Sequence, residues 1–160
     1  MWILTLIAII ASLTGYASMT SQIALEDAEG DARVTTLALD MVSYRSSVVR
    51  SVKADPSLSG IVAVNPSFTP IGYVGLTPPQ WSNYVVGDTI IVYSVGVSPP
   101  GLIKGITTLA QGSVLAGRAN TVTNKIEAPG TIGVDQIDLP SIPSPNTITN
   151  GAVIWLAYRE

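Results

Sequence analysis

The sequence contains neither cysteine nor histidine in its 160 residues. Without thiols the chain has no disulfide framework and no thiol nucleophile, and it lacks the usual ligands of a structural zinc site. Without imidazole it has no Ser-His-Asp triad and no histidine general base. These absences argue against an enzyme that depends on such groups, and we expect neither a metal nor a cofactor.

Charged residues are also scarce, at 12% of the chain. Eleven Asp and Glu outnumber eight Lys and Arg, which gives a formal net charge of −3. The basic residues are scattered and form no stripe that would neutralise phosphates, so the sequence argues against nucleic-acid binding. So little charge, with a mean hydropathy of +0.43, is typical of envelope and assembly proteins and is compatible with a homo-oligomer.

The first 19 residues, MWILTLIAIIASLTGYASM, are mostly apolar and carry no charged side chain. As a helix, this stretch would extend about 27 Å, close to the thickness of a bilayer core. We therefore expect residues 1–19 to be a membrane anchor or signal segment. Small residues would let such a helix pack against other membrane helices. They are Ala8, Ala11, Ser12 and Gly15.

Two other interpretations of this stretch stay open. Small residues at Gly15 and Ala17 stand where a signal peptidase reads them, so cleavage after Ala17 would release a soluble periplasmic protein. A prepilin leader would instead join basic residues to an apolar helix with a glutamate near its start, whereas the first acid here is Glu26. The acidic group that follows the stretch, residues 26–31, contains no basic residue that would keep it in the cytoplasm. This favours the periplasm for the rest of the chain.

Residues 20–160 are expected to fold as one α+β domain. Apolar residues at helical spacing predict an amphipathic helix over about 27–54, acidic at its start, basic at its end and stopped before Pro56. From 57 to 160, short β-rich runs broken by Pro and Gly predict a mainly antiparallel sheet that this helix covers, with one inserted helix. The β-rich runs are 60–65, 71–76, 88–97 and 152–159, the inserted helix begins near 102, and the proline-rich stretch 131–151 is a loop.

A pair of carboxylates supports a different hypothesis, that the protein is a hydrolytic enzyme. Asp135 and Asp138, in GVDQIDLP, would serve acid–base hydrolysis if they faced each other across a cleft. Solvation of a loop explains the same two residues. The alternative of a secreted hydrolase therefore depends on whether a cleft holds both carboxylates.

Three aromatic residues are candidates for contact with a partner: Trp81, Tyr84 and Trp155. Trp81 is expected in a loop before a strand, where it would either cover the local core or anchor a partner. Trp155 points to the opposite face from its apolar neighbours in the last predicted strand, so both faces of that strand are apolar. Either a central strand covered on both sides or an interface explains this pattern.

Four features together resemble the small PilM family of type IVB and conjugative thin-pilus gene clusters, which is distinct from the actin-like cytoplasmic protein of the same name. They are the apolar start beginning Met1-Trp2, the amphipathic helix, the block PPQWSNYVVGDTIIVYS and the terminal run NGAVIWLAYRE. The resemblance covers nearly the whole chain and rests on the order and the general composition of its segments.

The resemblance implies an accessory structural component of pilus biogenesis in the basal assembly apparatus, without enzymatic activity. Its implied location is the inner membrane with a periplasmic binding domain, and its implied partners are pilin or inner-membrane platform components. The alternative within the same system is a minor pilin or pseudopilin that enters the fibre.

Overall fold

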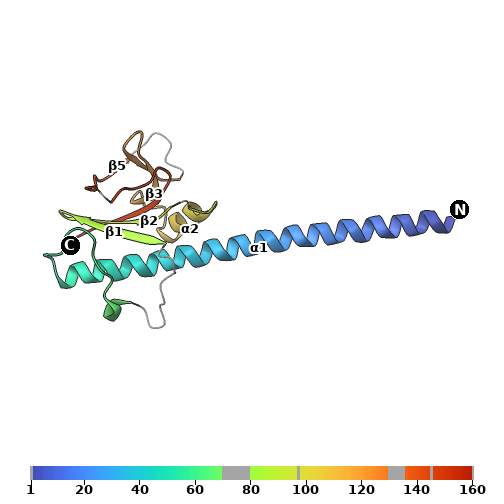
Figure 1. The fold of residues 1–160 in the computed structure, drawn as a ribbon, viewed down its shortest axis with the longest axis horizontal. Helices are drawn as coiled ribbons and strands as arrows, with labels where there is room; N and C mark the ends of the chain where they lie inside the picture. The colour runs from blue at the N-terminus through green and yellow to red at the C-terminus, as the bar shows by residue number, and fades with distance from the viewer. Residues whose placement is uncertain (1, 70–79, 97, 130–135, 145, 160) are drawn as a thin grey trace. The chain divides into compact units, whose positions relative to one another are not determined.

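The computed structural model describes residues 2–69, 80–96, 98–129, 136–144 and 146–159; for residues 2–26 and for Pro66 it describes the backbone alone. Contacts divide the chain into two units, Met1–Arg33 and Val34–Glu160. The first unit is the N-terminal part of α1, Trp2–Ala54 (Figure 1). The second unit holds the rest of α1 and all the other elements, and it is the folded domain described below.

The helix predicted over about 27–54 ends at Ala54 as expected, but it begins at Trp2. This start corrects the prediction that the acids at 27–31 open a helix, because the first turn of α1 contains no acidic residue. No proline precedes Pro56, so nothing in the chain breaks the backbone hydrogen bonds between the apolar stretch and the amphipathic stretch.

Within the described residues, six antiparallel strands form one sheet in the order β1-β2-β6-β3-β4-β5 (Figure 1). Their bounds are β1 Trp81–Val86, β2 Thr89–Ser94, β3 Ala116–Asn120, β4 Lys125–Glu127, β5 Ile137–Asp138 and β6 Val153–Tyr158. A two-residue turn with Gly87 at a φ of 53° joins β1 to β2. The last strand, β6, pairs with β2 on one side and with β3 on the other. The predicted α+β class with a mainly antiparallel sheet is confirmed.

One face of the sheet is covered by α1 and by α2, Leu102–Leu109 (Figure 1). Ala38 and Met41 of α1 share a core with Leu102 and Ile106 of α2. The strands contribute Trp81, Val92, Ala116, Val153 and Trp155 to the same core. Val48 and Val52 of α1 pack against the strands in a further cluster. Burying each large apolar side chain stabilises the fold by about 1.5–3 kcal/mol, so both clusters attach α1 to the sheet.

The opposite face of the sheet has a second core. Its strand residues are Ile91, Tyr93, Ala119, Ile126, Ile154 and Leu156. Leu139, Ile142 and Ile148, which follow β5 in the chain, pack against them. The first five residues of β6 are buried, so β6 is a central strand covered on both faces.

The segment after α1 attaches to both α1 and β1. Gly60 and Val85 exchange two backbone hydrogen bonds of 2.8 Å each. Farther along, the hydroxyl of Ser47 in α1 donates to the carbonyl of Phe68, 3.2 Å away, in the short helix η1, Pro66–Phe68. The prediction of a strand at 60–65 is therefore wrong: these residues form one isolated bridge. The run 71–76, also predicted as a strand, lies outside the described residues.

Other elements differ from the prediction in the middle and at the end of the chain. The inserted helix is confirmed by α2, but β3 and β4 follow it where no strand was predicted. Their sequences, AGRAN and KIE, contain only one β-branched residue and no aromatic residue, so they give little strand signal. The predicted loop 131–151 contributes the two-residue strand β5, and Trp81 is the first residue of β1 instead of part of a loop.

Gly117 lies where β3 passes very close to β4. A Cβ atom at this position would stand 2.5 Å from the carbonyl oxygen of Glu127 and 2.8 Å from Cγ2 of Ile126. Because the nearest atom belongs to the backbone of the neighbouring strand, no side-chain rotation would relieve the clash. Gly30 in α1 is the opposite case, since a Cβ there would meet nothing within 4 Å.

Asp55 follows α1 and holds the turn that leaves it. Its carboxylate accepts hydrogen bonds from the Ser57 hydroxyl at 2.6 Å and from the Ser57 backbone N–H at 3.0 Å. These bonds to the charged form, the hydroxyl first, lower the pKa of Asp55, and nearby Arg159 adds a smaller effect in the same direction.

We expect the lowered pKa of Asp55 to give the fold an acid-dependent contribution. A carboxyl whose folded pKa lies below its unfolded pKa stabilises the fold above the unfolded value, and this stabilisation is lost as pH falls through the folded pKa. Asp55→Asn should therefore flatten the loss of thermal stability below about pH 4. Melting curves of the wild type and the variant through the acid range measure this. Equal slopes for the two proteins would contradict it.

Candidate interaction surface

Two of the three aromatic candidates lie between α1 and the sheet. The indole N–H of Trp81 donates to the carboxylate of Asp40, with 2.5 Å between Nε1 and Oδ2. The ring of Trp155 lies under the Arg45 guanidinium, whose Cζ is 4.8 Å from the ring centroid. The exposed fractions of the two tryptophans are 5% and 8%. Both indoles thus contact their own domain, and the expectation that they contact a partner stays a prediction.

Arg45 is a partly buried cation between the helix and the sheet. Its Nη2 donates to the carbonyl of Leu156 at 3.0 Å, whereas its Nε has no partner among the described residues. Burial lowers the pKa of Arg45, yet a guanidinium stays protonated at neutral pH. The Trp155 ring and the carbonyl therefore offset part of the cost of removing this charge from water.

Asn83 of β1 connects three parts of the domain through its side chain, which is only 1% exposed. Its Oδ1 accepts from the backbone N–H of Val62 at 2.9 Å, and its Nδ2 donates to the Val62 carbonyl and to the Tyr44 hydroxyl, both at 2.8 Å. Burial raises the pKa of Tyr44, so this hydroxyl stays protonated. The bonds fix the segment around Val62 against β1 and α1.

The third aromatic candidate, Tyr84, lies on the sheet face opposite α1, beside exposed apolar side chains. Val86 and Tyr158 are both in register with Thr89, so they share that face with Tyr84. Ile61 follows the Gly60–Val85 bridge, which attaches this segment to β1. We call these four residues the β1–β6 patch: Ile61, Tyr84, Val86 and Tyr158, of which all but the half-buried Tyr84 are at least 40% exposed.

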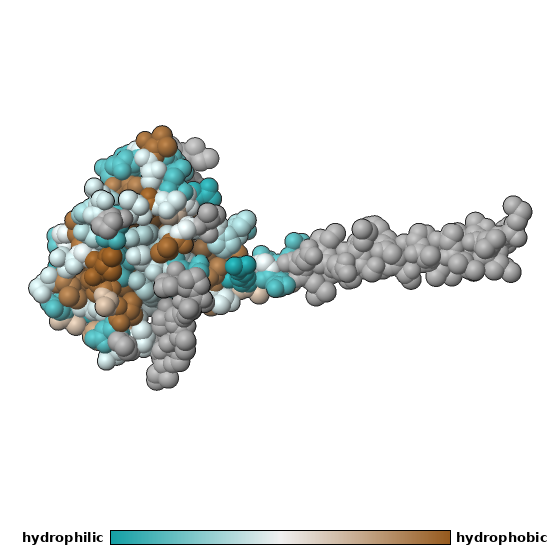
Figure 2. Space-filling model, viewed as in Figure 1, coloured by the Kyte–Doolittle hydropathy of each residue, from teal (hydrophilic) through white to brown (hydrophobic). Residues whose placement is uncertain are grey.

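Figure 2 shows apolar side chains gathered over β1 and beside the C-terminal end of the chain. Exposed apolar side chains on neighbouring strands are more informative than isolated ones, because contiguous patches mark contact sites. The sequence identified Tyr84 alone among them. Ile61, Val86 and Tyr158 were missed because they are far apart in the chain and become neighbours only through the strand register.

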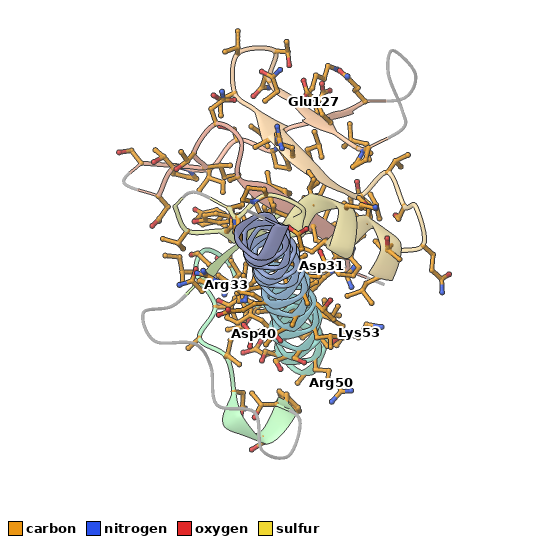
Figure 3. All side chains as sticks on the ribbon, turned by 90° about the vertical axis from the view of Figure 1, so that its right-hand side faces the viewer. Asp31, Arg33, Asp40, Arg50, Lys53 and Glu127 are labelled. Carbon is orange, nitrogen blue, oxygen red and sulfur yellow. The ribbon has the colours of Figure 1, made fainter. Side chains whose placement is uncertain are left out.

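A cavity of about 270 Å³ lies at the end of α1 and shares Tyr158 with the patch. We call it the α1-end cavity; it is lined by Val49, Val52, Lys53, Pro56, Ile90, Tyr158 and Arg159. Arg159 is held in place because its guanidinium donates to the carbonyls of Pro56 and Leu58 and its backbone N–H donates to the Asp88 carbonyl. Figure 3 shows Lys53 and Arg50 on the same end of α1, on the opposite side from Glu127.

The carboxylate pair proposed for hydrolysis is only partly described. Asp138 forms an ion pair with Lys125, with 2.5 Å between Oδ1 and Nζ, and its side chain is 80% exposed. Asp135 lies outside the described residues. Within the described ranges, no three Asp or Glu side chains come together in a group that would hold a metal ion.

Residues 2–19 of the predicted anchor lie in the part of α1 whose side chains are not described, and Met1 lies outside the described residues. The packing role of Ala8, Ala11, Ser12 and Gly15 therefore stays a prediction. No helix among the residues described in full is both long enough and apolar enough to cross a membrane.

The family model PilM matches residues 8–156. The chain belongs to the PilM family. This confirms the resemblance seen in the sequence, and PilM is a family of pilus biogenesis proteins. Such proteins are in general not enzymes.

Among solved structures, the crystal structure of a protein PilM from Escherichia coli B7A is similar to this chain. The two share 19% sequence identity and a TM-score of 0.53, and the alignment covers 79% of this chain and 93% of the other. At this identity the likeness concerns the fold. No curated protein matches the chain.

Proposed function

We propose that this PilM-family protein is an accessory structural component of type IV pilus biogenesis that acts by binding other pilus proteins. In this proposal residues 1–19 hold it in the inner membrane, and the α+β domain works in the periplasm as part of the basal assembly apparatus. The family match over 8–156 carries the proposal, since it concerns nearly the whole chain.

The structure supports a binding role through the β1–β6 patch. Its apolar side chains are exposed beside the β1–β2–β6 end of the sheet, where they would add buried area to a contact with another protein. Tyr84 and Tyr158 also present aromatic rings, which are enriched at protein interfaces. The partners proposed are pilin or inner-membrane platform components, and a second copy of the chain is a further possibility.

Removal of the gene is expected to abolish pilus assembly and pilus-dependent transfer, and complementation with the full chain should restore both. Intact mass and N-terminal sequencing of protein from separated membrane and soluble envelope fractions then locate it. A protein that retains Met1 and is found in the inner membrane would support the anchor. A protein that starts at Ser18 and is found in the soluble fraction would instead be a free periplasmic factor. Unchanged piliation and transfer in the deletion strain would refute the function.

A minor pilin or pseudopilin is the second candidate. One observation favours it: α1 is a continuous helix from the apolar start into a domain where it packs on an antiparallel sheet, an arrangement that fibre subunits share. A mature protein with an N-methylated new terminus, recovered in sheared fibres, would support this candidate over the anchored component.

A further inference from the structure

We propose that Asn150 is a site of deamidation that the native fold keeps closed, so that the chain is modified only when the loop before β6 opens. In this reaction the side-chain amide of an asparagine becomes a carboxyl group without an enzyme. The inference goes beyond the proposed function and does not depend on it. It rests on the residue that follows Asn150 and on the hydrogen bonds that hold these two residues in the loop, residues 146–152.

Asn150 is the one asparagine of the sequence that precedes a glycine. The six asparagines are Asn65, Asn83, Asn120, Asn124, Asn146 and Asn150. Deamidation begins when the backbone nitrogen of the next residue attacks the side-chain carbonyl carbon. A glycine at that position favours the attack, because it has no side chain to obstruct the nitrogen and its backbone reaches the widest range of conformations. In the unfolded chain we therefore expect Asn150 to react before the other five.

The reaction needs only water and releases only ammonia. The Gly151 nitrogen gives up its proton and forms a bond to Cγ of Asn150, the bond from Cγ to Nδ2 breaks, and the side-chain nitrogen leaves as ammonia. Water then opens the resulting five-membered imide at one of its two carbonyl carbons. Opening at Cγ gives aspartate. Opening at the main-chain carbonyl carbon gives isoaspartate, whose backbone passes through the former side chain and is one methylene longer.

In the folded domain, hydrogen bonds engage both of the groups that would react. The Gly151 N–H donates to the Ala119 carbonyl, with 2.8 Å between nitrogen and oxygen. Oδ1 of Asn150 accepts from the Thr121 N–H at 3.0 Å. The second bond polarises the Asn150 carbonyl, which favours attack, but the first must break before the Gly151 nitrogen can give up its proton. The Gly151 bond therefore controls the rate, and the reaction waits for the loop to open.

The modification would alter the start of the central strand β6. The Ala152 carbonyl accepts from the Ala119 N–H at 2.8 Å, and the Ala152 N–H donates to the Thr149 carbonyl at 3.0 Å. An aspartate product keeps the backbone length and an acceptor for the Thr121 N–H, so these bonds can form again. An isoaspartate product adds a methylene between Thr149 and Gly151, which shifts the loop against β3 and breaks this set of bonds.

Peptide mass spectrometry of the full chain, purified in detergent, tests the proposal. One sample stays folded and the other is unfolded in guanidinium chloride, and the conversion of amide to carboxyl is followed at each asparagine at mildly alkaline pH. We expect Asn150 to react first in the unfolded sample and about tenfold more slowly in the folded one, the factor that one protecting hydrogen bond supplies. Hydrogen exchange of the Gly151 amide in the folded sample should show protection of similar size.

Thr147→Gly is the matched control variant, because it gives Asn146 a glycine neighbour in the same loop. Thr147 is exposed, and its N–H donates to none of the described residues, whereas the Gly151 N–H is bound. In the folded variant Asn146 should therefore react about tenfold faster than Asn150. In denaturant the two rates should agree. A melting temperature close to that of the wild type shows that the variant folds.

Refolding measures the consequence for β6. When the incubated unfolded chain is returned to native conditions, the refolded fraction should retain the aspartate form and lose the isoaspartate form. Refolding of both forms alike would overturn the effect on β6.

Three further outcomes would contradict the inference. Equal rates at Asn150 in the folded and unfolded wild type would show that the fold gives no protection. A rate at Asn150 in denaturant no faster than at Asn124 would show that Asn150 is not a preferred site. If Asn146 of the folded variant reacts as slowly as Asn150, the loop as a whole controls the reaction and the Gly151 bond does not.

Discussion

Replacing Gly117 with valine is expected to lower the free energy of unfolding of the domain by about 3 kcal/mol, at the upper end of the usual cost of overpacking. The added Cβ would stand 2.5 Å from the Glu127 carbonyl oxygen, so β3 and β4 must separate to admit it. The β3–β4 pairing has only three residue pairs, and such a separation would disturb all of them. Urea unfolding of the wild type and the variant measures the difference.

Gly30→Ala is the matched control for this prediction. A Cβ at Gly30 meets open space inside a helix, where alanine is favoured over glycine by about 0.5–1 kcal/mol. The control should therefore lose no stability. If Gly117→Val unfolds at the same urea concentration as the wild type, β3 and β4 are not as close in solution as in the structure.

Asn83→Ala is expected to cost about 3 kcal/mol because it leaves several buried polar groups without partners. The Val62 N–H, the Val62 carbonyl and the Tyr44 hydroxyl all lose their bond to the amide side chain at once. A small cavity in the core adds to the loss. Denaturant unfolding gives the total, and amide hydrogen exchange at Val62 and Val85 shows whether the segment beside β1 opens first.

Tyr44→Phe provides a graded comparison, because it removes only the hydroxyl end of the same network. Its expected cost is about 1 kcal/mol, the contribution of one hydrogen bond. Equal losses for Tyr44→Phe and Asn83→Ala would mean that the bonds to Val62 contribute nothing, contrary to the structure.

The predictable parts of the fold are those whose sequence patterns are strong within one segment. The end of α1 follows from Pro56, and β2 and β6 follow from runs of β-branched, aromatic and other apolar residues that are buried on both faces. In contrast, β3 and β4 depend on pairing with neighbours, since a segment such as AGRAN has no intrinsic preference for a strand. At 60–65 the strand was over-predicted, because after the single bridge at Gly60 the Asn83 side chain takes the place of strand bonds at Val62.

The candidate surface was less predictable than the fold. Aromatic composition identified Trp81 and Trp155, whose main contacts prove to be with Asp40, Arg45 and the rest of the domain core. The same criterion identified Tyr84, which does lie on the exposed patch. The α1-end cavity joins residues from the end of α1, from β2 and from the last residues of the chain. A sequence pattern within one segment cannot predict a cavity that is formed by three segments far apart in the chain.

The place of β6 has a consequence for the timing of folding. The β1–β2 and β3–β4 hairpins share no edge with each other, and the strand that joins them is the last to leave the ribosome. Until it is made, the apolar faces of both hairpins lack their central neighbour, and the long-range contacts that define the sheet cannot form. The two hairpins can therefore join into one sheet only after β6 has been made.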